Sequence, residues 1–230
     1  ISRVIQHGSG SATYDRPVIL ERRIEIMADK PFVTFVRGPV VSAYRSINNE
    51  ATPYVPFAYL AAYIGQHGYR SAVIDGTAEA LNSIWRLDDF PGFQAQGLTL
   101  EETVERIPAH TDVIGYGATF SGEWPVARKL LAMIRTRFPN ALIVAGGEHI
   151  TAMTEYVLDD CDALDVCVRG EGEHTLYEVL EAWHENIGFD QVPGIGFRGE
   201  NGAYRENGGL PRIREINEIP WPEWPEGYLE

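Results

Sequence analysis

Two short apolar stretches in the second half of the chain, each ending at a glycine cluster, decide the predicted fold. The first is Ala141-Leu-Ile-Val-Ala-Gly-Gly147, and the second is Asp165-Val-Cys-Val-Arg-Gly-Glu-Gly-Glu173. Short apolar runs bounded by glycine are typical of buried strands in a parallel sheet. In an open α/β sheet, ligands bind beyond the carboxyl ends of such strands, where glycine lets the backbone turn and approach a ligand. We therefore expect both glycine clusters to lie at a ligand site.

Further apolar runs supply the other strands of the predicted sheet, and segments with helical spacing of apolar residues lie between them. The predicted strands are residues 31–36, 71–75, 112–116, 142–144 and 166–168, and the predicted helices are 53–64, 100–107, 124–138, 151–158 and 176–183. Thr99 and Glu102 have the spacing of a capping box at the start of one of these helices. Five strands alternating with helices predict a flavodoxin-like, doubly wound (Rossmann-like) five-stranded parallel sheet with strand order 2-1-3-4-5.

The remainder of the chain is predicted to flank this α/β domain. Asn201-Gly202, between the apolar segments 194–198 and 203–205, indicates a C-terminal β-hairpin. The proline-rich tail at 219–225 cannot form central secondary structure, so we interpret it as a linker leaving the domain. We divide the chain into an N-terminal extension, the α/β domain, and the hairpin with its linker, at residues 1–30, 31–190 and 191–230.

Composition narrows the classes of partner. A net charge of -14 repels polyphosphates and anionic membranes, which argues against nucleic acid and membrane as partners. No apolar run approaches the roughly 18 residues of a membrane span. We expect Cys161 and Cys167 to be reduced structural thiols, since Cys167 lies in a predicted strand. The N-terminus carries no secretory signal pattern, so we expect a cytoplasmic protein.

Common catalytic and nucleotide-binding motifs are absent from the sequence. There is no P-loop, no H-E-x-x-H zinc motif and no G-x-S-x-G elbow, and Glu171 places a carboxylate where a pyrophosphate would bind. Glu148 and His149 form either a catalytic pair or a capping or hydrogen-bonding pair. A stand-alone enzyme using Glu148, His149 and Glu171 as acids and bases is therefore one alternative. The other is that Glu171 and Glu173 only favour the start of the following helix.

A set of motifs follows in a fixed order between Pro31 and Pro225. It comprises residues 53–64, Gly68-Tyr69, Ile74-Asp75, Asp112-Val-Ile-Gly115, Ile143-Val-Ala-Gly-Gly-Glu-His149, Arg169-Gly-Glu-Gly-Glu173, Val192-Pro-Gly-Ile195 and Ile219-Pro-Trp-Pro222. This set resembles the N-terminal cobalamin (B12)-binding domain of B12-dependent radical SAM enzymes. Several motifs in the right order are more specific than any one of them. The family includes methyltransferases acting on unactivated carbon or phosphorus and the anaerobic cyclase of bacteriochlorophyll synthesis.

The resemblance implies a cobalamin site but no catalytic residue and no metal ligand in this chain. The glycine pair would lie against the nucleotide tail of cobalamin, the hydroxyl loop at 117–122 would hydrogen-bond that tail, and the Gly-Glu-Gly segment would lie on its far side, with His149 lining the same pocket. The implied cofactor-binding residues are Asp75, Thr77, Thr119, Ser121, Gly146, Gly147, Glu148, Gly170, Glu171 and Gly172. We expect Gly147→Val to abolish cobalamin binding and to leave the fold largely intact.

Two departures from the family pattern carry further expectations. Thr77 stands two residues after Asp75, where the classical motif has a cobalt-ligating histidine, so cobalamin should bind base-off without a histidine ligand. The CxxxCxxC motif is absent, so the 4Fe-4S cluster and S-adenosylmethionine are expected only in a radical SAM domain missing from this chain. We expect the chain to be the N-terminal piece of such an enzyme. The alternatives are a free-standing B12 carrier and a flavodoxin-like ligand-sensing module without a catalytic partner.

Overall fold

The computed structural model describes residues 30–46, 52–199, 202–209 and 215–224. Contacts between Cα atoms divide the chain into two units, Ile1–Lys30 and Pro31–Glu230. The expected N-terminal extension, apart from Lys30, lies outside the described residues. All that follows concerns the second unit.

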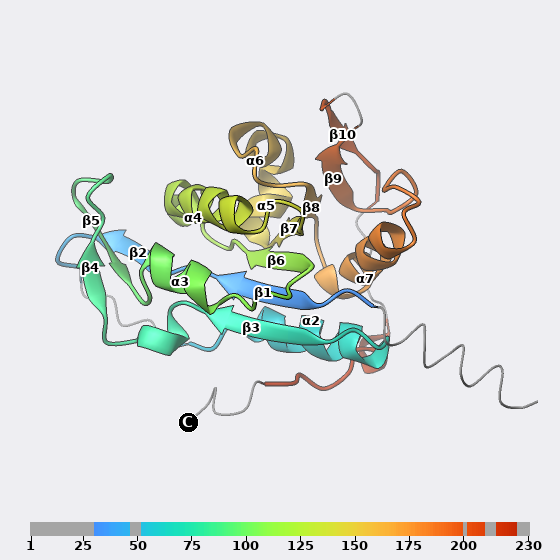
Figure 1. The fold of residues 1–230 in the computed structure, drawn as a ribbon, viewed down its shortest axis with the longest axis horizontal. Helices are drawn as coiled ribbons and strands as arrows, with labels where there is room; N and C mark the ends of the chain where they lie inside the picture. The colour runs from blue at the N-terminus through green and yellow to red at the C-terminus, as the bar shows by residue number, and fades with distance from the viewer. Residues whose placement is uncertain (1–29, 47–51, 200–201, 210–214, 225–230) are drawn as a thin grey trace, which may run out of the picture. The chain divides into compact units, whose positions relative to one another are not determined.

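The central element is a seven-stranded sheet in the order β10-β9-β8-β7-β6-β1-β3 (Figure 1). Its five parallel strands are β1 (Val33–Arg37), β3 (Ser71–Asp75), β6 (Val113–Gly117), β7 (Leu142–Gly146) and β8 (Val166–Val168). Numbered along the chain, these five strands have the spatial order 2-1-3-4-5. The predicted flavodoxin-like arrangement is therefore confirmed.

The predicted C-terminal hairpin is formed, and it extends the same sheet. β9 (Ile195–Arg198) pairs antiparallel with β8, and β10 (Tyr204–Glu206) pairs with β9. Ile195 and Phe197 are buried, so the hairpin contributes to the core. The five predicted parallel strands are thus joined by two antiparallel strands from the segment that we separated at residue 191.

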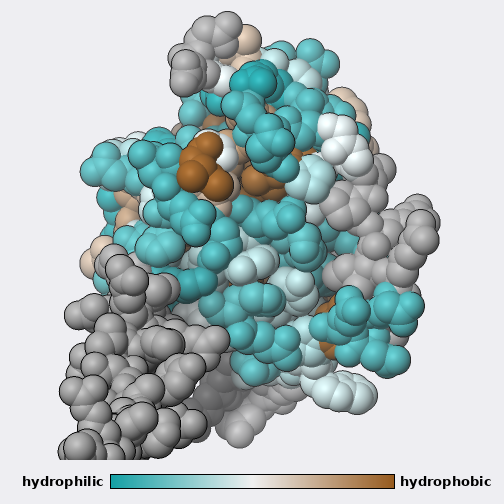
Figure 2. All heavy atoms as spheres, turned by 90° about the vertical axis from the view of Figure 1, so that its right-hand side faces the viewer, coloured by the Kyte–Doolittle hydropathy of each residue, from teal (hydrophilic) through white to brown (hydrophobic). Residues whose placement is uncertain are grey.

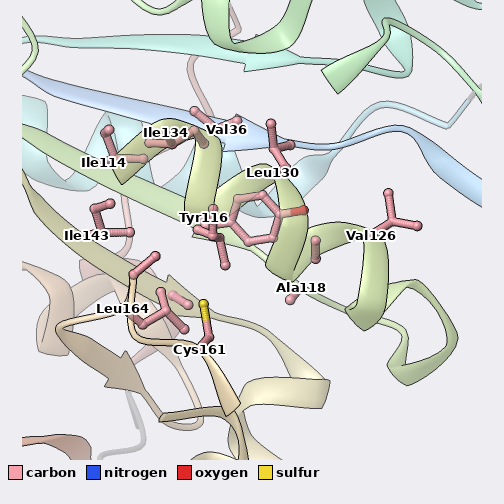
Figure 3. Close-up of a cluster of buried hydrophobic side chains, with 14 of the residues drawn as sticks. Val36, Ile114, Tyr116, Ala118, Val126, Leu130, Ile134, Ile143, Cys161 and Leu164 are labelled. Atoms are coloured by element: carbon pink, nitrogen blue, oxygen red, sulfur yellow. The ribbon is translucent and has the colours of Figure 1, made fainter. Parts of the chain in front are cut away.

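Helices cover both faces of the sheet. α2 (Val55–Gln66) and α7 (Gly172–His184) share one buried cluster, which includes Phe35, Val144 and Val168. A second cluster holds the buried side chains of α3 (Leu100–Arg106), α4 (Trp124–Arg137), α5 (Glu148–Ala152) and α6 (Thr154–Asp160). Part of that second cluster is shown in Figure 3, where α4 packs over β6 and β7. The two clusters form the two halves of a doubly wound core.

Two local predictions for the helices have different outcomes. The capping box is confirmed: the Glu102 N–H donates to Thr99 Oγ1 over 3.2 Å, and the Thr99 N–H donates to the Glu102 carboxylate over 2.8 Å. The predicted helix at 151–158 is wrong in its bounds, because two short helices occupy this region. The chain breaks at Met153, whose φ of -131° is not helical.

A small antiparallel sheet beyond the carboxyl ends of β1 and β3 was not predicted. It consists of β2 (Val40–Ala43), β5 (Phe93–Gln96) and β4 (Ile84–Arg86), and it lies at the left of Figure 1. Short 3-10 turns cover Ala78–Ala80, Ser121–Glu123 and Ile216–Glu218. The segments interpreted as long loops after β1 and β3 are therefore partly ordered as one added sheet.

The described part of the proline-rich tail stays on the domain. The Glu223 N–H donates to the carbonyl of Ala58 in α2 over 3.0 Å, and Figure 1 shows the tail running along that helix. The tail thus contacts the domain at Glu223, and its role as a linker stays a prediction. Pro225 itself lies outside the described residues.

The surface and the cysteines complete the description of the fold. Figure 2 views the face from which β1 and β3 begin, and its described side chains are mostly hydrophilic. Cys161 and Cys167 are both free and buried, as predicted. Within the described residues, no helix has the length and apolar character needed to cross a membrane.

Candidate functional site

A cleft of about 810 Å³ lies at the carboxyl ends of the parallel strands. Its floor comes from the face of the sheet that α2 and α7 cover, and includes Phe35, Val144 and Val168. Its walls are the first turns of α2 and α7. The cleft therefore enters between the sheet and these two helices, at the edge where doubly wound domains bind ligands.

Glycines in β6 shape one wall of this cleft. A β-carbon at Gly115 would lie 2.8 Å from the ring of Phe35, and one at Gly117 would lie 2.7 Å from the ring of Tyr54. Because these positions have no side chain, both aromatic rings can lie directly against the strand. The Tyr54 ring also contacts Phe57, with ring centroids 4.6 Å apart. The two glycines of β6 thus leave space for the aromatic rings of Phe35 and Tyr54 at the side of the cleft.

The two glycines after β7 have different roles. A β-carbon at Gly146 would have no atom closer than 4.0 Å, so a side chain there would extend into the cleft. Gly147 has a φ of 117°, and a β-carbon there would lie 2.3 Å from the carbonyl oxygen of Ala118. The expectation that Gly147→Val would spare the fold is therefore wrong. Gly147 is required for the close approach of its own backbone to the loop after β6.

The Gly170-Glu171-Gly172 segment forms the opposite side of the cleft. All three residues line it, and Gly172 lies close to Leu60 of α2. The Gly170 N–H donates to Thr151 Oγ1 over 3.0 Å, which ties this segment to the helix after the glycine pair. Thr151 also lines the cleft and was missed, because a single threonine inside a predicted helix carries no distinguishing signal.

The two hydroxyl residues of the loop after β6, Thr119 and Ser121, lie in different surroundings. Thr119 lines an adjacent cavity rather than the cleft, and its hydroxyl lies 3.1 Å from the hydroxyl of Tyr54. Ser121 lines neither space, and its hydroxyl lies 2.9 Å from Nδ1 of His149. Tyr54, which lines both spaces, was not singled out because its position at the start of α2 resembled an ordinary core position.

His149 lies away from the cleft, under Ser121 and Trp124. It is only 4% exposed, its ring centroid is 5.1 Å from that of Trp124, and burial lowers its pKa. Its Nε2 is buried without a hydrogen-bond partner among the described residues. The expectation that His149 lines the ligand pocket is therefore wrong. Of the three residues in the alternative acid–base group, only Glu148 and Glu171 line the cleft, so that group does not assemble there.

Asp75 and Thr77 are buried supports of the loop after β3 and do not line the cleft. Oδ1 of Asp75 accepts hydrogen bonds from the backbone N–H groups of Thr77 and Ala78, over 3.0 and 3.1 Å. Oδ2 of Asp75 lies 3.6 Å from the Arg37 guanidinium. The Thr77 hydroxyl donates to the carbonyl of Gly38 over 3.4 Å. A short carboxylate that accepts from the next backbone N–H groups is a turn-stabilising device.

A second, smaller space of about 220 Å³ adjoins the cleft, and we call it the side cavity. Tyr54, Tyr116 and Gly117 line both spaces and so lie at their boundary. Arg37, Glu123 and Thr119 also line the side cavity. Burial raises the pKa of Tyr54, and the hydrogen bond with Thr119 opposes that shift. The Tyr54 hydroxyl therefore stays protonated at neutral pH.

The charge at the mouth of the cleft is negative. Glu148, Glu171 and Glu173 line it, and none of the described residues in its lining is Lys, Arg or His. No group of three His, Cys, Asp or Glu side chains able to hold a metal ion occurs in the described ranges. The cleft is thus suited to a large, mostly apolar ligand whose enclosed part carries no strong negative charge.

An apolar cleft at the carboxyl edge of a 2-1-3-4-5 sheet defines a ligand-binding domain of the flavodoxin-like class. Comparison with protein families then identifies its type. The B12 binding domain family matches residues 49–180, which is more than half of the chain. The chain belongs to the B12-binding domain family.

Individual relatives agree with this assignment. An uncharacterized methyltransferase from Pyrococcus horikoshii is 27% identical over 193 residues, covering 84% of this chain and 38% of the relative. An anaerobic magnesium-protoporphyrin IX monomethyl ester cyclase from Synechocystis sp. is 36% identical over 104 residues, covering 44% of this chain and 21% of the relative. The chain therefore spans well under half the length of these relatives.

A solved structure shares the fold. It is that of the cobalamin-dependent S-adenosylmethionine radical enzyme OxsB with aqua-cobalamin and S-adenosylmethionine bound. The TM-score is 0.68 at 20% sequence identity, and the match covers 88% of this chain and 25% of that one. The predicted resemblance to the B12-binding domains of radical SAM enzymes is confirmed by these comparisons.

Proposed function

We propose that this domain binds cobalamin with the nucleotide tail inside the cleft and the lower base detached from cobalt. The observation that carries the proposal is the open position at Gly146, where a β-carbon would enter the apolar space between the sheet and its two covering helices. An aromatic base suits such a space, because Phe35, Val144 and Val168 offer only apolar contacts to it. The family match at residues 49–180 supports the same ligand.

The residues at the mouth would hold the rest of the tail. Gly146, Gly170 and Gly172 permit close backbone approach, while Glu148 and Glu171 lie at the rim. Thr119 and Ser121, although they do not line the cleft, belong to the loop that Gly147 fixes against Ala118. Asp75 and Thr77 would act indirectly, by fixing the loop after β3. When bound, cobalamin supplies a cobalt centre able to carry a methyl group between a donor and an acceptor.

The absence of a nearby imidazole supports binding without a histidine ligand. Thr77 is 1% exposed and its hydroxyl is directed to a backbone carbonyl, so it is not available to cobalt. Of the described residues that line the cleft or the side cavity, none is a histidine. The lower face of the corrin would therefore meet oxygen or apolar groups of this chain.

The full protein is proposed to be a B12-dependent radical SAM enzyme of the methyltransferase or cyclase type. Its relatives are much longer than this chain, which supports a radical SAM domain in the same polypeptide that holds the 4Fe-4S cluster and S-adenosylmethionine. Residues 31–190, together with the hairpin strands β9 and β10, would form the cofactor domain, and the segment after the hairpin would form the connection. Free, buried cysteines are consistent with a reducing compartment, and we propose the cytoplasm.

Retention of cobalamin tests the proposal directly. The purified chain is incubated with hydroxocobalamin, passed through a gel-filtration column, and examined by absorption spectroscopy. We expect a corrin spectrum of the base-off form to elute with the protein. A folded sample, verified by circular dichroism, that elutes without any corrin would refute the proposal and favour a sensor of some other ligand. A free-standing carrier would retain cobalamin equally, so only the sequence of the full gene separates that alternative.

A further inference from the structure

The side cavity combines an apolar floor with a few convergent polar groups. Figure 3 shows Tyr116, Ala118, Val126 and Leu130, all of which line it. The Tyr116 hydroxyl is directed away from Ile114 and Ile143, toward the side on which the cavity lies. The lining passes from these buried residues to the 62% exposed side chain of Phe120, so the cavity reaches the surface on that side.

The charges around this cavity are unequal. Arg37 contributes one positive charge, but its guanidinium already lies 3.6 Å from the fully buried Asp75 carboxylate and donates to the Thr52 carbonyl over 3.4 Å. Glu123 contributes a second carboxylate, which accepts a hydrogen bond from the Val41 N–H over 3.4 Å. Of these three residues only Arg37 and Glu123 line the cavity, and the Asp75 carboxylate behind Arg37 offsets its positive charge. The Glu123 carboxylate would therefore repel an anionic occupant.

A neutral group that both donates and accepts hydrogen bonds fits these surroundings. A carboxamide has two N–H donors and a carbonyl acceptor. The Glu123 carboxylate can accept from such a group in addition to its other partners, since a carboxylate offers about four acceptor sites. The hydroxyls of Thr119 and Tyr54, 3.1 Å apart, lie at the boundary with the cleft and supply a donor.

We propose that the side cavity receives one carboxamide arm of cobalamin, and that Glu123 selects the amide over the corresponding acid. This inference rests on the proposed function. Cobalamin carries several amide-ended arms around its corrin ring, and a cofactor whose tail fills the cleft would bring its ring to the adjoining edge. Because Tyr54 and Gly117 line both spaces, an arm of that ring has the side cavity within reach.

The test uses cobalamin derivatives in which a single amide arm has been hydrolysed to a carboxylate. Dissociation constants of cobalamin and of each monocarboxylic isomer are measured by spectroscopic titration with the wild-type chain, Glu123→Gln, and the matched control Glu105→Gln. Glu105 is exposed on α3 and lines neither space. We expect one isomer to bind the wild type at least about tenfold more weakly than cobalamin does. Glu123→Gln should restore that isomer to within about threefold of cobalamin, whereas Glu105→Gln should leave the defect unchanged.

Other outcomes contradict the inference without touching the proposed function. Equal affinities for all isomers, or a defect that persists in Glu123→Gln, would overturn it while cobalamin itself still binds. Failure of cobalamin to bind the folded wild type would instead refute the proposed function. If Glu123→Gln does not fold, the wild type alone provides the test. The loss of affinity for the selected isomer should become smaller between pH 8 and pH 5, because its carboxylate arm becomes protonated. A loss that does not change with pH would refute the assignment.

Discussion

Replacing Gly146 by valine tests the position of the ligand more sharply than any other change. The new β-carbon would lie 4.0 Å from Val168, an ordinary contact, so the strand can accept it. The two methyl groups would occupy space in the cleft. Excess atoms in a filled apolar space typically cost ~1–3 kcal/mol, which weakens binding by roughly 5- to 150-fold. Valine suits a strand better than glycine, so unfolding free energy should change by no more than about 1 kcal/mol.

The assay is titration of Gly146→Val with hydroxocobalamin, accompanied by urea unfolding. Gly208→Val is the matched control, because a β-carbon at Gly208 meets nothing within 4 Å and Gly208 does not line the cleft. It should bind as the wild type does. Gly147→Val, in contrast, should lose stability itself, because its β-carbon would overlap the Ala118 carbonyl. Wild-type affinity in a stable Gly146→Val variant would show that the ligand does not approach this strand end.

Three further outcomes are expected. The electron paramagnetic resonance spectrum of the chain loaded with cob(II)alamin should lack the threefold nitrogen splitting of an axial nitrogen ligand, because the buried Thr77 stands where such a ligand would be. If that splitting appeared, it would contradict base-off binding without a histidine ligand. Burial lowers the pKa of His149, so the unfolded state binds more protons, and stability should fall as pH drops below about 6.5, by up to ~1.4 kcal/mol per pH unit. Urea unfolding at pH 7.5 and 5.5 should show a smaller pH effect in His149→Gln than in the wild type, and an equal effect would assign the loss to other groups. Thr99→Ala should reduce the free energy of unfolding by about 1 kcal/mol, because the capping box is lost. Urea unfolding measures this decrease, and a decrease smaller than the one in Glu102→Ala would contradict the capping role of Thr99.

The sheet could be predicted from the sequence because its signals are local. Apolar runs ending at glycine fixed the strands that end near Gly146 and Gly170, and helical spacing between them gave the parallel order. The small sheet was missed for the opposite reason. Its strands β2 and β4 have only four and three residues, too few to show an alternating pattern, and their pairing depends on contacts far apart in the chain.

The ligand site was only partly predictable, since neighbouring residues with similar patterns have different environments. The glycine pair was expected to act as one feature, yet Gly146 faces the cleft and Gly147 faces Ala118. His149, two residues after Gly147, is directed away from the cleft, toward Ser121. These differences depend on φ and on tertiary packing, which no spacing rule encodes. The resemblance to the family indicated the region in which the cleft lies, but not the surroundings of each side chain.

The cleft, which is the larger of the two spaces, reduces packing mainly in one half of the core. Most of its buried apolar lining belongs to the cluster under α2 and α7, whereas the cluster under α4 borders the smaller side cavity. Local opening should therefore require less free energy in α2 and α7 than in the rest of the domain, and amide hydrogen exchange should slow there when a ligand fills the cleft. Because the Glu223 N–H donates to the carbonyl of Ala58 in α2, the tail at 219–224 contacts the part of the domain whose local order should change most. Binding of a ligand in the cleft would thus also change the local order of the tail that contacts α2.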